Sequence, residues 1–222
     1  MDALPVEERL LFPLMAIDVG AKAGFIDPDE RSLEFARQIA RDDFEVVRND
    51  PDIPYESVVE VDVSAVEPQV ACPPNVQNVK PVGDVAGTAI QLAEIGGSAG
   101  GRLTDLRVAA QVLKDRRVHP DLRFQIVPAS TGIYRRALDE GLLEIFLDAG
   151  VIIFPPSAGS NQAVNMGAMA TGEAMISTQA RNFPGRNGSP DAHHYLASAQ
   201  TVAASAVKGC IADPRVLSRT VW

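Results

Sequence analysis

Two loops of this sequence carry serines in settings that are typical of chemical sites. One loop, FPPSAGSNQAV, places Ser157 and Ser160 three residues apart at the end of an apolar run. The other, IGGSAGGRLTDLR, places Ser98 among four glycines between an expected strand and an expected helix. The spacing in the first loop is that of paired metal ligands, but serine hydroxyls are neither soft nor anionic at neutral pH. Both loops therefore have the form of sites without the usual reactive groups.

The glycine-rich loop is suited to bring its backbone close to an anion, because glycines before a helix expose N–H groups at the helix N-terminus. It does not match the known nucleotide-binding patterns. The pattern G-x-G-x-x-G cannot be placed on its glycines, and the phosphate-loop pattern fails at Arg102 and Leu103. We therefore expect no nucleotide site, and a tight turn is the alternative explanation for the glycines.

A third loop, QARNFPGRNG, carries Arg181 and Arg186 together with Asn182. Guanidinium groups bind carboxylates through forked, charge-assisted hydrogen bonds. Each such bond contributes about 1.5–3 kcal/mol when it is desolvated. The loop is therefore a candidate carboxylate-binding loop, and two solvated arginines are the alternative that its composition fits equally well.

Histidines and cysteines provide weaker candidates. His193 and His194 are adjacent, so on the helix that we expect here their side chains diverge by about 100° and do not bind one metal together. Cys72 and Cys210 lie far apart without metal-ligand or redox spacing, and we interpret them as small buried hydrophobic residues. Asp18 is either a general base or an acid on the polar face of the first helix. We predict no metal site.

Composition limits the class of protein. The 222 residues suffice for one large α/β domain or two small ones, with 46% hydrophobic and 22% charged residues. The formal charge of −9 repels polyanions, so we expect no nucleic-acid partner. The acidic start MDALPVEERLLFPLMA lacks the features of a secretion signal or a membrane span. We expect a cytoplasmic protein without a membrane partner.

Hydrophobic spacing predicts the elements that position these loops. We expect helices at 6–24 (with a bend), 27–41 (capped by Asp27), 104–114, 133–149 and 193–208, strands at 55–63, 89–95, 124–128, 151–154 and 174–178, and a long loop at 68–83. The alternation from residue 89 onward is typical of parallel βαβ units. Ligands of such sheets bind beyond the carboxyl ends of the strands, where all three loops are expected.

The order of these loops resembles the aconitase superfamily, most closely the large subunits of isopropylmalate dehydratases. The resemblance rests on IGGSAGGRLTDLR, IVPAS, FPPSAGSNQAV, ISTQARNFPGRNG and AASAVKGCIADPR, in that order. The segments LLFPLMAIDVGAKAGFIDPDE and PYESVVEVDVSAVEPQV fit the same family. The resemblance implies a three-layer α/β/α fold with mostly parallel sheets over residues 1–222. Two subdomains, 1–88 with parts of the C-terminal helix region and 89–175, are an alternative division.

Enzymes of this superfamily move a hydroxyl group on a di- or tricarboxylic acid by dehydration and rehydration, with a 4Fe–4S cluster as Lewis acid. Three cysteines hold that cluster. Matching the motifs puts these cysteines at Ser98, Ser157 and Ser160, and a cluster requires thiolates. The resemblance therefore leads us to expect no iron–sulfur cluster and no other cofactor.

The family's carboxylate-binding arginines match Arg181 and Arg186, since RNFPGR fits the family pattern RNFxGR. A glutamate of the family's catalytic region matches Asp18, which is one methylene shorter, and the family's asparagine before the first arginine is Ala180 here. The departure at Ala180 removes part of the family's substrate network.

We therefore expect a cluster-free lyase or isomerase subunit, similar to a hydro-lyase, that acts on a small di- or tricarboxylic acid. The candidate catalytic residues are Asp18 and Ser98, and the candidate substrate-binding residues are Arg181, Arg186, Ser157, Ser160 and Asn182. The chain matches only the C-terminal part of a large subunit, so we expect partner subunits that supply the N-terminal portion and a small-subunit domain. The alternative is a non-catalytic ligand-binding or scaffold subunit of a split complex.

Overall fold

The computed structural model describes residues 3–161 and 166–217, and of Ser98 it describes the backbone alone. The chain forms two compact units, Met1–Ala65 and Val66–Trp222. Residues 66–88 lie in the second unit. The reason is that the strand Gln69–Ala71 pairs with the strand His193–Ala197, far along the chain.

Helices make up the regular structure described in the first unit. They are α1 (Val6–Arg9), α2 (Leu11–Met15), the 3-10 helix η1 (Ala16–Val19), α3 (Glu30–Ile39) and the 3-10 helix η2 (Val63–Ala65). The helix expected at 6–24 is thus three short segments, and it ends at Gly20, whose φ of 86° lies in the left-handed region. Pro13 lies in the first turn of α2, where its missing N–H costs little.

Asp29, and not Asp27, caps α3. Its carboxylate accepts a hydrogen bond from the backbone N–H of Ser32 at 2.9 Å. The Nη1 of the buried Arg9 lies 2.8 Å from the other carboxylate oxygen. The backbone N–H of Ser32 and the Arg9 guanidinium hold the pKa of Asp29 well below its ordinary value. The pair joins α1 to the start of α3.

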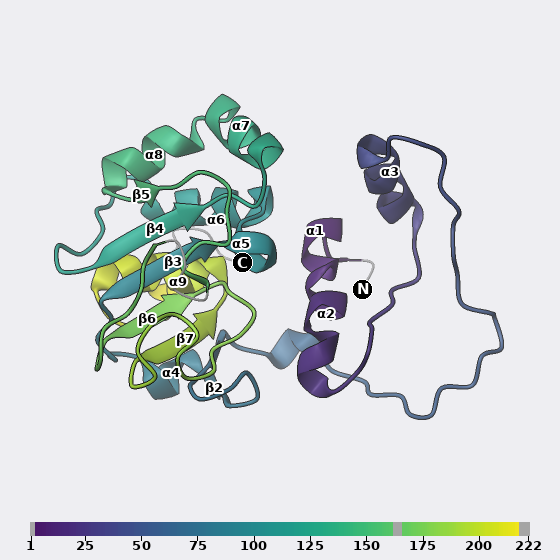
Figure 1. The fold of residues 1–222 in the computed structure, drawn as a ribbon, viewed down its shortest axis with the longest axis horizontal. Helices are drawn as coiled ribbons and strands as arrows, with labels where there is room; N and C mark the ends of the chain where they lie inside the picture. Colours follow the sequence, from purple (N-terminus) through teal and green to yellow (C-terminus); the bar gives the residue numbers. More distant parts are fainter. Residues whose placement is uncertain (1–2, 162–165, 218–222) are drawn as a thin grey trace. The chain divides into compact units, whose positions relative to one another are not determined.

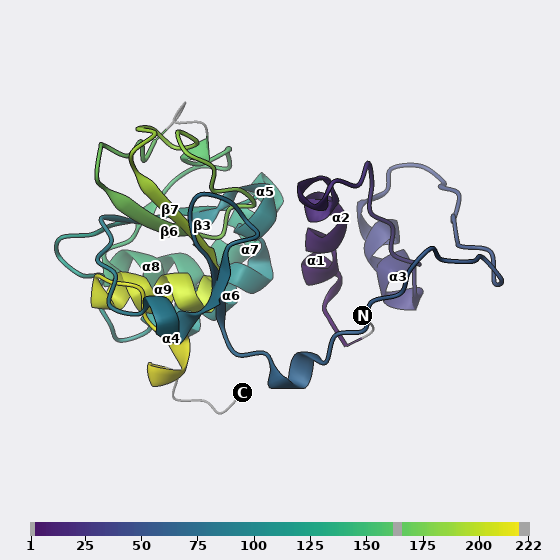
Figure 2. The ribbon, with the colours of Figure 1, turned by 90° about the horizontal axis from the view of Figure 1, so that it is seen from below.

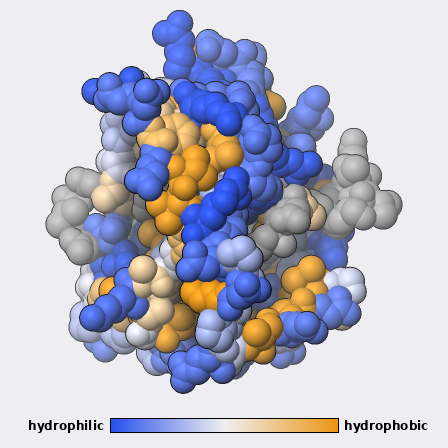
Figure 3. Space-filling view, turned by 90° about the vertical axis from the view of Figure 1, so that its right-hand side faces the viewer, coloured by the Kyte–Doolittle hydropathy of each residue, from blue (hydrophilic) through white to orange (hydrophobic). Residues whose placement is uncertain are grey.

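The strand predicted at 55–63 is wrong. These residues have no regular structure up to η2, and the alternating valines Val58, Val59, Val61 and Val63 are exposed. An alternating pattern becomes a strand only when a partner pairs with its backbone groups, and the described residues provide none here. Exposed apolar side chains are frequent in this unit, and Figure 3 shows apolar and hydrophilic surface interleaved on the face that it presents.

A mostly parallel sheet of seven strands forms the second unit (Figure 1). Its strands are β1 (Gln69–Ala71), β2 (Val79–Pro81), β3 (Leu92–Gly96), β4 (Arg123–Val127), β5 (Ile152–Ile153), β6 (Ala174–Ser177) and β7 (His193–Ala197). Their order is β2-β1-β7-β6-β3-β4-β5. The five strands from β7 to β5 are parallel, and β1 pairs antiparallel with both β2 and β7. The predicted α/β class is confirmed, and the architecture is consistent with a three-layer aconitase-like fold.

Two predicted elements of this unit are corrected. The loop expected at 68–83 contains the hairpin of β1 and β2. The helix expected at 193–208 is β7 followed by α9 (Ala199–Lys208). Ser198 separates the two, because its hydroxyl accepts the backbone N–H of Thr201 at 3.3 Å and caps the helix.

Helices cover the sheet and enclose the main core. They are α4 (Val82–Val85), α5 (Gly97–Gly100), α6 (Leu103–Leu113), α7 (Thr131–Asp139), α8 (Leu142–Ala149), α9 and the 3-10 helix η4 (Pro214–Val216). Figure 2 shows α6, α8 and α9 on one face of β3, β6 and β7. In the described parts of the chain, none of the helices combines the length and the apolar character that crossing a bilayer requires.

Packing explains the glycines between β3 and α6. A Cβ on Gly96 would lie 2.7 Å from the Val127 side chain, and one on Gly100 would lie 2.1 Å from the Thr178 side chain. A Cβ on Gly101 would lie 2.4 Å from the Val127 carbonyl oxygen. These contacts support the tight-turn explanation, since each glycine meets protein atoms at its Cβ position.

Candidate carboxylate-binding site

A row of polar side chains crosses three central strands. Gln125 of β4 and Ser177 of β6 both lie directly opposite Glu94 of β3 in the strand register. The neighbours of Glu94 in the chain, Ala93 and Ile95, belong to the main core with α6 and α9. Because side chains alternate along a strand, the polar row lies on the sheet face opposite that core.

The carboxylate of Glu94 is fully buried and accepts hydrogen bonds from three directions. The side-chain amides of Gln125 and Gln179 donate to it, the latter at 2.7 Å. The backbone N–H of Ser160 donates to the same carboxylate at 2.9 Å. A Cβ on Gly159 would lie 2.8 Å from a carboxylate oxygen of Glu94, so the chain passes this group closely. The Glu94 network thus joins the FPPSAGS loop to the centre of the sheet.

The arginine loop, residues 179–187, follows β6 and is held at both ends. The side-chain amide of Gln179 donates to the Ser160 hydroxyl at 2.8 Å, and that of Asn187 donates to the same oxygen at 3.0 Å. In the middle of the loop, the side chain of Asn182 donates to the Ala71 carbonyl oxygen of β1 at 3.2 Å. A loop without helix or strand is therefore fixed by three side-chain amides that are buried or half-buried.

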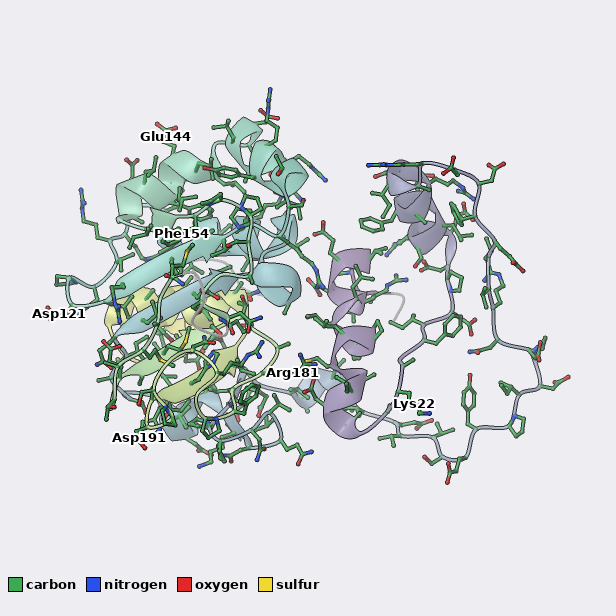
Figure 4. All side chains as sticks on the ribbon, viewed as in Figure 1. Lys22, Asp121, Glu144, Phe154, Arg181 and Asp191 are labelled. Carbon is green, nitrogen blue, oxygen red and sulfur yellow. The ribbon has the colours of Figure 1, made fainter. Side chains whose placement is uncertain are left out.

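Both arginines extend from this fixed loop. Arg181 is half-buried, and Figure 4 labels it at the right-hand margin of the second unit. The Arg186 guanidinium stacks over the Phe183 ring at 5.3 Å. A cation over the face of an aromatic ring is attracted by the ring, so this contact helps to orient the guanidinium. The loop therefore carries two guanidinium groups on a pre-organised backbone.

The arginine loop also carries side-chain oxygens that can accept hydrogen bonds. The side-chain carbonyl oxygens of Gln179, Asn182 and Asn187 are buried and have no hydrogen-bond partner among the residues that the structure describes. Buried amide oxygens usually bind a donor such as a hydroxyl or a water. The loop thus combines donors for carboxylates with acceptors for hydroxyl groups.

His194 adds a buried titratable group next to the network. As part of β7, and not of a helix, it points to the opposite sheet face from the exposed His193. Its Nε2 lies 2.7 Å from the Ser177 hydroxyl, which also accepts the backbone N–H of Gln179. Burial, and secondarily the nearby Arg186 guanidinium, lowers the pKa of His194 from 6.5 to about 3. The imidazole is therefore neutral at neutral pH.

His194 is expected to make the fold sensitive to acid. The unfolded chain binds a proton at this histidine below pH 6.5, but the folded chain does so only near pH 3. Proton binding to the unfolded chain therefore lowers the free energy of unfolding as the pH falls from 6.5 towards 3, by roughly 1 kcal/mol per pH unit. Above pH 6.5 His194 is neutral in both states, so this loss is absent. His194→Gln is expected to flatten the decline between pH 6.5 and pH 4 in urea unfolding experiments.

His193→Gln is the matched control, because His193 is the exposed neighbour on the same strand. It is expected to keep the pH dependence of the original protein. Equal slopes for the His194 and His193 variants would contradict the assignment of a depressed pKa to His194.

The structure separates the serines that the sequence analysis grouped. The Ser160 hydroxyl is fully buried and accepts two amide N–H groups, so it faces the arginine loop. Ser157 is half-buried, and its hydroxyl accepts the backbone N–H of Gly159 at 3.2 Å. The Ser98 side chain lies outside the described atoms, although its backbone belongs to α5. Asp18 lies on η1 of the first unit, and the other candidates lie on the second.

The cysteines lie on other segments of the chain than the serine loops. Cys72 is buried after β1, as we predicted, whereas Cys210 after α9 is half-buried. Both thiols are free. Within residues 3–161 and 166–217 there is no group of three or more His, Cys, Asp and Glu side chains arranged to hold a metal ion.

Sequence reasoning missed the residues that hold the arginine loop. Glu94 and Gln125 lie inside the apolar runs QLAEIGG and RFQIVP, where a single polar residue is a signal of a buried network. Gln179 and Asn187 flank the two arginines that were identified. Their role depends on Ser160, which is distant in the chain and therefore not visible from local spacing.

The parallel sheet, the glycine turn after β3 and the arginine loop after β6 define an α/β protein with a candidate site for anions. The chain belongs to the aconitase family. The model of that family, described as aconitate hydratase, matches residues 1–88 and 80–209.

Curated relatives agree with this membership. The chain is 49% identical over 211 residues to a probable 3-isopropylmalate dehydratase large subunit of Methanothermobacter thermautotrophicus, covering 95% of this chain and 50% of the relative. It is 46% identical to the 3-isopropylmalate dehydratase large subunit of Sulfurihydrogenibium sp., with 96% and 49% covered. Large subunit 2 of Archaeoglobus fulgidus is also 46% identical, with 96% and 51% covered. The chain spans about half the length of these relatives.

Proposed function

We propose that this chain binds a small di- or tricarboxylic acid as part of a lyase or isomerase that works without an iron–sulfur cluster. Family membership supports chemistry of the hydro-lyase type. The observation that carries the proposal is the arginine loop, in which Arg181 and Arg186 extend from a backbone fixed by Gln179 and Asn187. Pre-organised guanidinium groups suit the recognition of carboxylates at fixed positions.

The donor atoms support the absence of a cluster. We propose that Ser98, Ser157 and Ser160 occupy the positions of the family's cluster cysteines, and iron–sulfur clusters require anionic, soft thiolates. The Ser160 hydroxyl is also engaged by two amide N–H groups, and it lies beside the buried carboxylate of Glu94. The set of hydroxyl, amide and carboxylate groups does not fit a 4Fe–4S cluster, and no step is assigned to one.

A dehydration without a Lewis acid requires another way to stabilise the leaving group. A departing hydroxide needs a general acid to protonate it, unless the substrate carries an easier leaving group. We propose dehydration next to an activating carbonyl, isomerisation or decarboxylation, in which Arg181 and Arg186 hold carboxylates. We propose that Asp18 or a residue of a partner subunit transfers the proton. The Ser98 hydroxyl is a further candidate for this catalytic role.

Partner subunits are part of the proposal. The relatives are named large subunits and are about twice as long as the matched region. We propose that further chains supply the portions beyond this region and complete a site in the cytoplasm. The chain should be mixed with products of neighbouring genes and assayed for turnover of di- and tricarboxylic acids. Turnover supports the enzyme, whereas carboxylate binding without turnover in any combination supports a ligand-binding subunit.

Metal analysis is expected to find no cluster. Anaerobically purified protein should contain far less than one iron and one acid-labile sulfide per chain, because the matched positions provide no thiolates. The same should hold after treatment with ferrous iron and sulfide under reducing conditions. The measurements are colorimetric iron and sulfide assays together with visible absorbance. Iron and sulfide in the ratio of a 4Fe–4S cluster would refute this part of the proposal.

A further inference from the structure

One oxygen atom connects the two ends of the arginine loop. The Ser160 hydroxyl accepts hydrogen bonds from Gln179, two residues before Arg181, and from Asn187, directly after Arg186. Both ends of the segment that carries the guanidinium groups are therefore bound to the same atom. The separation of the two ends of the loop is therefore set at this junction.

Glu94 connects that junction to the sheet. Its carboxylate accepts the backbone N–H of Ser160 and the same Gln179 amide that binds the Ser160 hydroxyl. Glu94 lies on β3, which is paired on both sides, with β4 and with β6. The connection thus runs from the arginine loop through Ser160 to the most constrained part of the fold.

We propose that Ser160 and Glu94 are positioning residues that set the spacing of Arg181 and Arg186, and thereby select ligands with two carboxylates. The inference rests on the proposed binding of carboxylates by this loop. A dicarboxylate that contacts both guanidinium groups binds more tightly when their separation is fixed in advance, whereas a monocarboxylate needs only one of them. Ordering of long side chains is costly, so a loop that is fixed in advance favours the ligand that spans it.

The test uses malate and lactate, which share a 2-hydroxy acid group and differ in the second carboxylate. Calorimetric titration of the full chain should give a higher affinity for malate. Ser160→Ala is expected to reduce the malate preference by about tenfold, because the arginines remain but their spacing relaxes. The lactate affinity should change little.

Ser205→Ala is the matched control. Ser205 is also fully buried, and its hydroxyl donates to the Thr201 carbonyl oxygen at 2.7 Å and accepts the Ala212 N–H at 3.0 Å. It lies on α9, so its loss removes a similar pair of hydrogen bonds and leaves the arginine loop intact. The malate preference of this variant should equal that of the original protein.

Glu94→Gln provides a second variant in case Ser160→Ala does not fold. Glutamine keeps the shape of the side chain, but its NH₂ group cannot accept the hydrogen bonds that Gln125, Gln179 and the Ser160 N–H donate to the Glu94 carboxylate. This variant too should reduce the malate preference. Folded variants at Ser160 or Glu94 with the preference of Ser205→Ala would overturn the positioning role and leave the proposed function intact. Equal affinity of the original protein for malate and lactate would overturn both.

Discussion

Alanine in place of Arg181 or Arg186 is expected to weaken the binding of dicarboxylates by about 10- to 100-fold. Each substitution removes one charge-assisted, forked contact, while the backbone of the loop stays fixed by Gln179 and Asn187. The dicarboxylate affinity of Arg186→Lys should lie between those of the original protein and Arg186→Ala. Lysine keeps the charge but loses the planar fork and the contact with the Phe183 ring. The quantity that should show this loss is the ligand affinity.

Titration calorimetry with malate and citrate measures this effect, and circular dichroism monitors the fold. Arg135→Ala is the control, since Arg135 lies on α7 with 77% of its side chain exposed and pairs with Asp139 at 3.5 Å. It should bind both acids as the original protein does. If both arginine-loop variants also retain full affinity, the assignment of the carboxylate site has to be abandoned.

Gly101→Ala is expected to destabilise the fold by about 3 kcal/mol. The added Cβ would lie 2.4 Å from the Val127 carbonyl oxygen and 3.0 Å from the Ala129 backbone nitrogen. Both are backbone atoms, and the Ala129 N–H already donates to the Gly101 carbonyl oxygen at 2.8 Å. A backbone cannot turn aside as a side chain does, so β4 and the start of α6 must move apart.

Gly83→Ala is the matched control for this substitution. Gly83 lies in α4, and a Cβ there would meet no atom within 4 Å. Alanine in a helix restricts the unfolded chain, so the free energy of unfolding should stay unchanged or rise by roughly 0.5–1 kcal/mol. Urea denaturation compares the two variants directly. Equal stability of both would show that the close approach at Gly101 does not constrain the fold.

Much of the second unit is predictable because its strands are apolar runs of suitable length. The strands expected at 89–95, 124–128, 151–154 and 174–178 each correspond to a strand of the sheet, with ends that differ by a few residues. Two predictions were wrong for the same reason, because strand formation depends on a pairing partner that is distant in the chain. The residues at 55–63 alternate as a strand would but have no described partner, and His193 pairs with Ala174 in a strand although an alanine-rich helix follows. Ser198, a residue type that favours helix N-termini, was the available signal for the latter boundary.

The candidate site was predictable only in part. Arg181 and Arg186 stand out in the sequence because an irregular loop gives them no helical or strand role. Glu94 and Gln125 do not, because burial on a central strand depends on what covers the strand. The use of the Ser160 hydroxyl by two amides from another loop is a tertiary property, so no local pattern predicts it.

The short strands at both margins of the sheet have a consequence for the behaviour of the protein in concentrated solution. The described margins are β2, which has three residues and ends at Pro81, and β5, which has two. Such margins expose few free backbone groups, and proline lacks the N–H that a further strand would need. The second unit is thereby protected from edge-to-edge aggregation and from amyloid-like growth, even though its central strands are mostly apolar.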